Sequence, residues 1–237
     1  MKKLIILFLL IAGQVPVWGQ TVNIHMKDGR VIEYDASDVN YVNFSSQNHE
    51  AVDLGLPSGL KWATCNIGAS KPEDTGYYLA WGETSDKEEY EWANYKWCNG
   101  SKTSLTKYTS QSTLEPDDDA AHALWGGTWR MPSVEDANEL MRECSKSVVT
   151  QNGVKGTIFT GPNGNSIFLP ASGCLSYENN WEGLHGLYWL NSTQNNNWND
   201  DPAADYFELD CQTVKYSTYR APRCWGLTIR AVTDAGK

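Results

Sequence analysis

The chain has 237 residues, which is long enough to bury a hydrophobic core of its own. Its 19 Lys and Arg residues stand against 29 Asp and Glu residues, and the net charge is −10. Because a surface this acidic repels phosphate backbones and anionic lipids, we expect no nucleic-acid partner. No segment after the N-terminus is apolar for long enough to span a bilayer as a helix, so we expect no transmembrane segment.

The N-terminus predicts a secretory signal peptide over residues 1–19. Lys2 and Lys3 precede the apolar run 4–12, and a small residue precedes the polar Gln20. The alternative is a buried N-terminal strand. No cysteine follows the cleavage point for a lipid anchor, so we expect a secreted, periplasmic or cell-surface protein. Cleavage removes both lysines and no acidic residue, which takes the net charge to about −12.

Residues 20–46 are expected to form a small N-terminal β unit. Apolar residues alternate over 22–26, and an Asp-Gly pair at 28–29 separates them from a second apolar stretch at 31–34. This pattern is typical of a β-hairpin. Residues 39–44 predict one more short strand. Because so few strands cannot hold a core, we expect the unit to dock on the main domain or on a partner.

After a polar linker at 45–50, the main domain is expected over residues 51–232. Pro116 and the acidic residues 117–119 predict the start of a short helix that ends before Gly126-Gly127. Ser133 and Asp136 form a capping-box pattern that predicts a second helix over 133–145. Beyond it the chain predicts a hairpin of 156–160 with 166–170, followed by strands at 206–210 and 227–232.

Six cysteines remain after cleavage, and they permit three disulfides in an exported protein. The alternative is a set of buried free thiols, because a chain of this length can build its own core. No close C-x-x-C pair occurs, so zinc-ribbon and thioredoxin chemistry have no support. The cysteines are Cys65, Cys98, Cys144, Cys174, Cys211 and Cys224.

Three blocks of the main domain carry a family resemblance. Residues 52–69 read VDLGLPSGLKWATCNIGA, residues 125–133 read WGGTWRMPS, and residues 226–232 read GLTIRAV. Together they resemble the Fibrobacter succinogenes major paralogous domain, a C-type-lectin-like module of exported Bacteroidota proteins, over nearly all of 51–232. The resemblance implies an α+β fold with two short helices and an antiparallel, loop-rich sheet. We expect 227–232 to be central in a sheet and the 133–145 helix to pack on it.

The resemblance indicates the fold better than the function, and it names no ligand. Aromatic and asparagine side chains intermingle over 176–225, and such mixtures are typical of recognition surfaces. We therefore expect these loops to bind an extracellular glycan or protein. The alternative is that the aromatic residues belong to the core. The candidate contacts are Trp181, Trp189, Trp198, Asn199, Asp200 and Tyr219.

Two groups of oxygen ligands are candidates for a structural calcium ion. The tripeptide at 198–200 resembles one that calcium-dependent C-type lectins use, but their upstream Glu-Pro-Asn or Gln-Pro-Asp element is matched only by the distant residues 115–117. The alternative is that one group caps a helix and the other lies in solvent. The first group is Asp117, Asp118 and Asp119, and the second is Asn199, Asp200, Asp201 and Asp205.

Catalysis finds no support in the sequence. Residues 129–133 resemble the WRLPT segment of formylglycine-generating enzymes, which need two reactive cysteines a few residues apart near the C-terminus. Cys211 and Cys224 are too far apart to match. No nucleophile elbow and no glycine-rich phosphate loop is present. We therefore expect a binding module. The alternatives are such an enzyme, or a structural component of a surface assembly to which residues 21–46 supply a strand edge.

Overall fold

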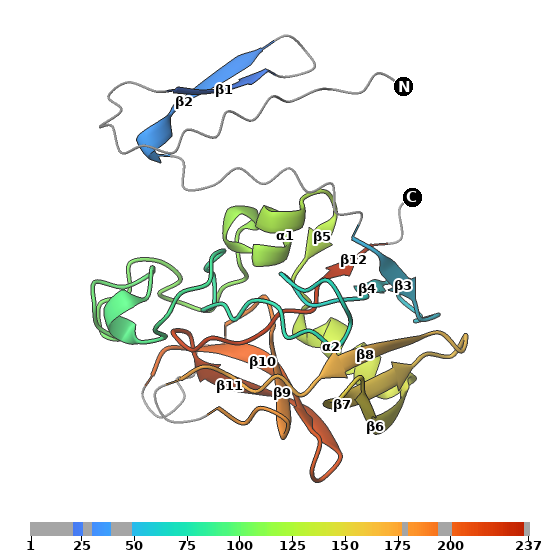
Figure 1. Cartoon of the computed structure of the whole chain (residues 1–237). Helices are drawn as coiled ribbons and strands as arrows, with labels where there is room; N and C mark the ends of the chain where they lie inside the picture. The colour runs from blue at the N-terminus through green and yellow to red at the C-terminus, as the bar shows by residue number, and fades with distance from the viewer. Residues whose placement is uncertain (1–20, 26–29, 39–48, 177–179, 194–200, 235–237) are drawn as a thin grey trace. The chain divides into compact units, whose positions relative to one another are not determined.

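The computed structural model describes residues 21–25, 30–38, 49–176, 180–193 and 201–234. The chain divides into two units, Met1–Asn48 and His49–Lys237 (Figure 1). The expected signal peptide, the expected strand at 39–44 and the tripeptide at 198–200 lie outside the described residues. Within the described ranges, no helix is both long and apolar enough to cross a membrane.

The first unit contains the expected hairpin. Strand β1 (Thr21–His25) pairs in antiparallel fashion with β2 (Val31–Asp35), and a 3-10 turn, η1 (Ala36–Asp38), follows. The register sets Ile24 opposite Ile32, as the alternation of apolar residues predicts. The sheet of this unit has two strands in the part that the structure describes.

The second unit is an α+β fold of antiparallel sheets with two α-helices, as expected (Figure 1). One sheet joins the two ends of the unit in the order β3-β4-β12-β5. Its last strand in sequence, β12, lies between β4 and β5, and Val232 is paired with Trp62 on one side and Arg130 on the other. The strands are β3 (Ala51–Asp53), β4 (Lys61–Ala63), β5 (Trp129–Arg130) and β12 (Val232–Thr233).

Two further sheets of three strands each complete the unit. The first runs in the order β6-β7-β8 and contains the expected hairpin. The second runs in the order β11-β10-β9 and contains the expected strand at 206–210. The strands are β6 (Ser145–Gln151), β7 (Val154–Thr160), β8 (Ser166–Pro170), β9 (His185–Trp189), β10 (Ala203–Asp210) and β11 (Lys215–Pro222).

The expectation of a regular strand over 227–232 is wrong for most of its length. Of these six residues, Val232 alone belongs to a strand, β12, and residues 227–231 lie outside the strands. Leu227 bridges Leu79 in an irregular loop, whereas Thr228 bridges Tyr188 of β9. Because successive residues bond to different segments, the stretch is central in the unit but pairs with no single strand.

The second helix begins where its capping signal predicts, whereas Pro116 starts a separate 3-10 turn and the first helix begins only after Asp119. After the 3-10 turns η2 (Trp92–Asn94) and η3 (Pro116–Asp118), helix α1 (Ala120–Trp125) starts at its N-cap Asp119 and ends at Gly126. Gly126 has a φ of 69°, which favours glycine. Helix α2 (Val134–Glu143) has the expected capping box. It is shorter than 133–145, because the chain enters β6 at Ser145.

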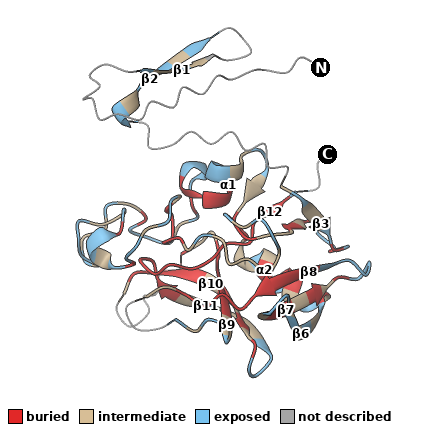
Figure 2. Ribbon diagram, in the orientation of Figure 1, coloured by how far each residue is buried: buried red, intermediate tan, exposed pale blue. Residues whose placement is uncertain are grey.

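Buried side chains gather in two clusters of the second unit. Figure 2 marks the buried positions in red along the ribbon. In one cluster, Ala137 and Leu140 of α2 pack with Phe207 and Leu209 of β10. Helix α2 therefore covers one face of the β9-β10-β11 sheet. The other cluster packs Trp189 of β9 among apolar side chains that include Leu79, Trp81 and Leu227.

A fully buried arginine holds several of these segments together. The Arg230 guanidinium donates to Asn66 Oδ1 at 2.8 Å, to the carbonyl oxygens of Ala63 and Thr64 at 3.2 and 3.1 Å, and to that of Phe168 at 3.0 Å. All four acceptors are neutral, so hydrogen bonds rather than an ion pair compensate for the desolvation of the charge. The 226–232 block thereby links the 52–69 block to β8.

Candidate functional site

The two faces of the β9-β10-β11 sheet differ in character. Along β10, Phe207 and Leu209 are buried against α2, whereas Tyr206 and Glu208 are half-buried on the opposite face. The register places Tyr219 of β11 directly opposite Tyr206. Side chains of the opposite face thus come from neighbouring strands and form a surface that α2 does not cover.

Aromatic rings occupy this surface. The Tyr206 and Tyr219 rings lie 6.0 Å apart between centroids, and Tyr219 is 50% exposed. Trp181, in the loop before β9, is half-buried, and its ring lies 5.7 Å from that of His185 and 6.4 Å from that of the buried Trp225. We call the set Trp181, His185, Tyr206, Glu208 and Tyr219 the open face.

A histidine–carboxylate pair lies within the open face. His185 Nδ1 and Glu208 Oε1 are 2.8 Å apart, and both side chains are partly exposed. With a carboxylate oxygen as the acceptor, Nδ1–H is assigned as the donor of this bond. Within the described part of the chain, His185 Nε2 and Glu208 Oε2 have no hydrogen-bond partner, so each can accept a bond from a ligand.

The hydroxyl of Tyr206 remains protonated at the open face. Burial raises the pKa of Tyr206, and the nearby charge of Glu208 adds to this effect. A neutral phenol both donates and accepts a hydrogen bond. The open face therefore offers aromatic rings, two acceptor atoms and a hydroxyl that serves in either role.

The structure separates the candidate contacts of the sequence. Trp181 and Tyr219 belong to the open face. The expectation that Trp189 contacts a ligand is wrong: its side chain is fully buried, and its Nε1 donates to the Leu79 carbonyl oxygen at 2.7 Å. Trp189 shares the Tyr206 side of the sheet, but the 79–81 segment packs over that end. The remaining candidates, Trp198, Asn199 and Asp200, lie outside the described residues.

Three residues of the open face were not among the candidates. Tyr206 and Glu208 fall within the expected strand 206–210, and His185 precedes an apolar run. Side chains alternate between the two faces of a strand, so Tyr206 and Glu208 lie on the face opposite Phe207 and Leu209. This alternation could have identified Tyr206 and Glu208 from the sequence. His185 carries no such signal, because only the pairing of β9 with β10 brings it to Glu208.

The acidic candidates of the helix start have structural partners. Asp119 Oδ1 accepts from the backbone N–H groups of Ala121 and His122, and both its oxygens accept from that of Met131. Asp118 Oδ2 lies 2.6 Å from Lys107 Nζ. Although burial opposes it, hydrogen bonds from Lys107 and Tyr108 hold the pKa of Asp118 below its usual value. These contacts favour helix capping and ion pairing over calcium binding at 117–119.

The second acidic group is only partly described. Asp201 Oδ1 lies 2.8 Å from Lys102 Nζ, and Asp205 Oδ2 accepts from the Ser192 hydroxyl at 2.8 Å. In the described ranges, no three His, Cys, Asp or Glu side chains come together as metal ligands. The contribution of Asn199 and Asp200 lies outside those ranges, so the calcium prediction for this loop stays a prediction.

The six cysteines, all within the described residues, form no disulfide with one another. Burial raises the pKa of Cys144 and Cys174 to about 11 and that of Cys224 to about 12. It also raises the pKa of Cys211. The thiolate is the nucleophile in cysteine chemistry, and burial disfavours it at Cys211 and Cys224. The alternative of formylglycine-type catalysis through these two cysteines is correspondingly disfavoured.

A thiol titration is expected to distinguish the cysteines by exposure. Cys65 and Cys98 are half-buried, whereas the other four are buried. In native protein, DTNB at pH 8 should therefore react promptly with Cys65 and Cys98 and slowly with the rest, because burial both blocks access and disfavours the thiolate. Denatured protein should show all six thiols. A shortfall in the denatured protein would demonstrate disulfides and contradict the free state.

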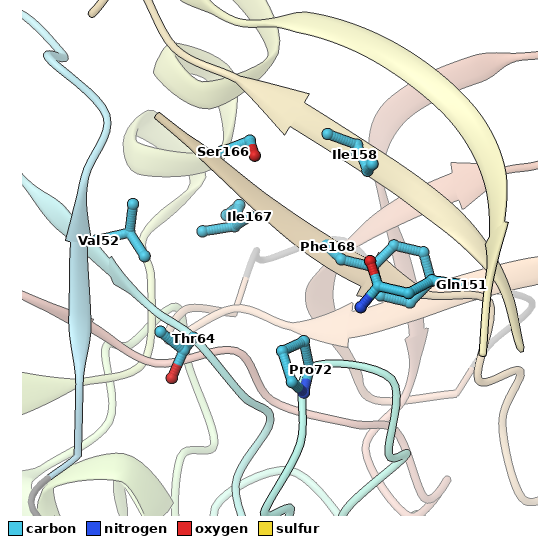
Figure 3. Close-up of a pocket in the computed structure, with 8 residues that line it drawn as sticks. All are labelled: Val52, Thr64, Pro72, Gln151, Ile158, Ser166, Ile167 and Phe168. Atoms are coloured by element: carbon cyan, nitrogen blue, oxygen red, sulfur yellow. The ribbon is translucent and has the colours of Figure 1, made fainter. Parts of the chain in front are cut away.

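A separate pocket of about 160 Å³ lies between β3 and β8 (Figure 3). Ligand pockets for small molecules usually enclose about 300–1,000 Å³, so this one is small for that purpose. No charged side chain lines it, and its walls are largely apolar. We therefore place the candidate site on the open face instead. The pocket is lined by Val52, Thr64, Pro72, Gln151, Ile158, Ser166, Ile167 and Phe168.

Comparisons of the chain with known protein families, with curated proteins and with solved structures found no match. The case for a function therefore depends on the geometry of the site.

Proposed function

We propose that the protein is an exported binding module that recognises a glycan or a protein outside the cell through its open face. The observation that carries the proposal is the exposed ring of Tyr219 together with the half-buried ring of Trp181 and the His185–Glu208 pair on one face. Rigid aromatic rings contribute contact area at little entropic cost, and unpaired acceptors between them give direction. The face opposite α2 has both.

The finer fold assignment is part of the same proposal. We infer that the second unit is a C-type-lectin-like domain of the Fibrobacter succinogenes major paralogous type. Support comes from the three blocks that carry the resemblance, because β4, β5 and β12 come from these blocks and are neighbours in one sheet. The expected cleavage of residues 1–19 makes this domain a secreted, periplasmic or cell-surface one.

Truncation of the aromatic rings is expected to weaken ligand binding. Trp181→Ala and Tyr219→Ala each remove a ring that buries against the ligand, and we expect each to lower affinity about tenfold or more. The measurement is binding of the full chain to a glycan array and to extracellular host proteins. Any detected interaction then gives a Kd for each variant.

Tyr77→Ala is the matched control, because Tyr77 is an exposed tyrosine, 40% accessible, that is not part of the open face. The affinity of this variant should stay within about twofold of the parent protein, since no ring contact or hydrogen bond joins Tyr77 to the open face among the described residues. Thermal melts must first establish that each variant is folded. Unchanged binding by both Trp181→Ala and Tyr219→Ala would contradict the proposed surface.

A further inference from the structure

We infer that the ligand of the open face is an uncharged saccharide, held by its hydroxyl groups against Glu208, His185 and Tyr206 and by its ring against Tyr219 and Trp181. This inference rests on the proposed function and narrows it from glycan or protein to one chemical class. It uses only residues that the structure describes.

The first step is the hydrogen-bond chemistry of the pair. His185 satisfies Glu208 Oε1 at 2.8 Å and leaves Glu208 Oε2 and His185 Nε2 as two acceptors in the same pair. In the described part of the chain neither has a partner, and the Tyr206 hydroxyl likewise makes no hydrogen bond. This arrangement matches neighbouring hydroxyl groups of a sugar. Sugar hydroxyls can donate to Glu208 Oε2 and His185 Nε2, and they can either donate to or accept from the Tyr206 hydroxyl.

The second step is the aromatic contribution. Tyr219 is half exposed and tilted by 37° against Tyr206, so part of its ring faces outward. Trp181 lies beside His185 and rests on the buried Trp225, which limits its movement. A pyranose ring has apolar C–H faces between its polar edges. It can therefore place a face on an aromatic ring while its edge hydroxyls reach the polar atoms.

The third step is charge. Among the described residues, Glu208 forms no ion pair with a lysine or arginine, and His185 is the one basic side chain that it contacts. The whole chain has a net charge of −10. A sugar acid would meet an uncompensated carboxylate in an acidic field, which is unfavourable. Uronic acids and sialic acids are thereby disfavoured relative to neutral sugars.

A cationic ligand is the competing chemistry, because an ammonium group would also suit Glu208. The two are separated by replacing Glu208 with its neutral isostere. In Glu208→Gln the one amide oxygen keeps the hydrogen bond from His185, and the amide N–H donates to the oxygen of the sugar hydroxyl, so the variant should bind a neutral saccharide within about threefold of the parent protein. Glu208→Ala removes the acceptor and should weaken binding about tenfold. For a cationic ligand, both variants would lose affinity to a similar extent.

The experiment uses the full chain and follows tryptophan fluorescence during titration with named probes. The probes are oligosaccharides from neutral glucans, mannans and galactans, with polygalacturonate as the acidic probe and polylysine as the cationic one. We expect a neutral probe to bind and polygalacturonate not to. Tyr219→Phe should retain this binding and Tyr219→Ala should lose about tenfold in affinity. Glu135→Ala, which removes an exposed carboxylate of α2, is the control and should change nothing.

Each other outcome overturns a defined statement. If polylysine or an extracellular protein binds and no neutral saccharide does, and Tyr219→Ala abolishes that binding, the saccharide inference fails and the proposed binding surface stands. If a neutral saccharide binds equally well to every open-face variant, the open face is not the site, and the proposed surface fails as well. If no probe and no protein binds, both statements are overturned.

Discussion

Arg230→Met is expected to lower the free energy of unfolding by about 4 kcal/mol. Methionine fills a similar volume but donates no hydrogen bond, so Asn66 Oδ1 and the carbonyl oxygens of Ala63, Thr64 and Phe168 lose their donor in the interior. Buried acceptors without a partner cost far more than a hydrogen bond contributes in water. Because a domain is typically stable by only about 5–15 kcal/mol, this single change would remove a large share of it.

Denaturant unfolding of the parent protein and the variant measures this effect. Arg230→Lys keeps the charge, but its donors sit on one nitrogen that cannot reach four acceptors on separate segments, so we expect it to restore little stability. Arg142→Met is the control. Arg142 is exposed on α2, and its loss should change stability by at most about 0.5 kcal/mol. A loss below about 1 kcal/mol for Arg230→Met would contradict this role.

Local signals in the sequence predicted local structure well. The Asp-Gly pair at 28–29 gave the first hairpin, and Ser133 with Asp136 gave the start of α2. In both cases the residues that decide the conformation are within a few positions of one another. The pairing of β1 with β2 and the capping box of α2 depend little on the rest of the chain, so one sequence is enough to predict them.

Non-local pairing limited the rest. The 227–231 segment looks like a strand by alternation, but its partners are the 67–79 loop on one side and β9 on the other. No pattern within the segment reveals that. Trp189 shows the same limit for the site. The residue type alone does not reveal whether an aromatic side chain in a loop-rich region is buried or exposed. The His185–Glu208 contact joins residues 23 positions apart and requires the register of β9 on β10.

Asp119→Ala is expected to lower the free energy of unfolding by about 3 kcal/mol. The carboxylate caps α1 through the N–H groups of Ala121 and His122 and also accepts from Met131 N–H with both oxygens, at 3.0 and 2.9 Å. Loss of an N-cap alone costs about 1 kcal/mol, and the buried N–H of Met131 would add a further unpaired donor.

The same change should loosen the connection between α1 and the segment that follows β5, because Asp119 is the group that bonds to both. Hydrogen exchange is therefore expected to speed up at Ala121, His122 and Met131 before it does so in α2, which has its own capping box.

Asp117→Ala is the matched control: Asp117 is exposed in the same acidic run, and its removal should cost at most about 0.5 kcal/mol. Equal losses for Asp117→Ala and Asp119→Ala would mean that the acidic run acts through general charge at the helix start. A loss confined to Asp119→Ala, with exchange localised to α1 and Met131, would establish that one carboxylate fixes the helix to the WGGTWRMPS block.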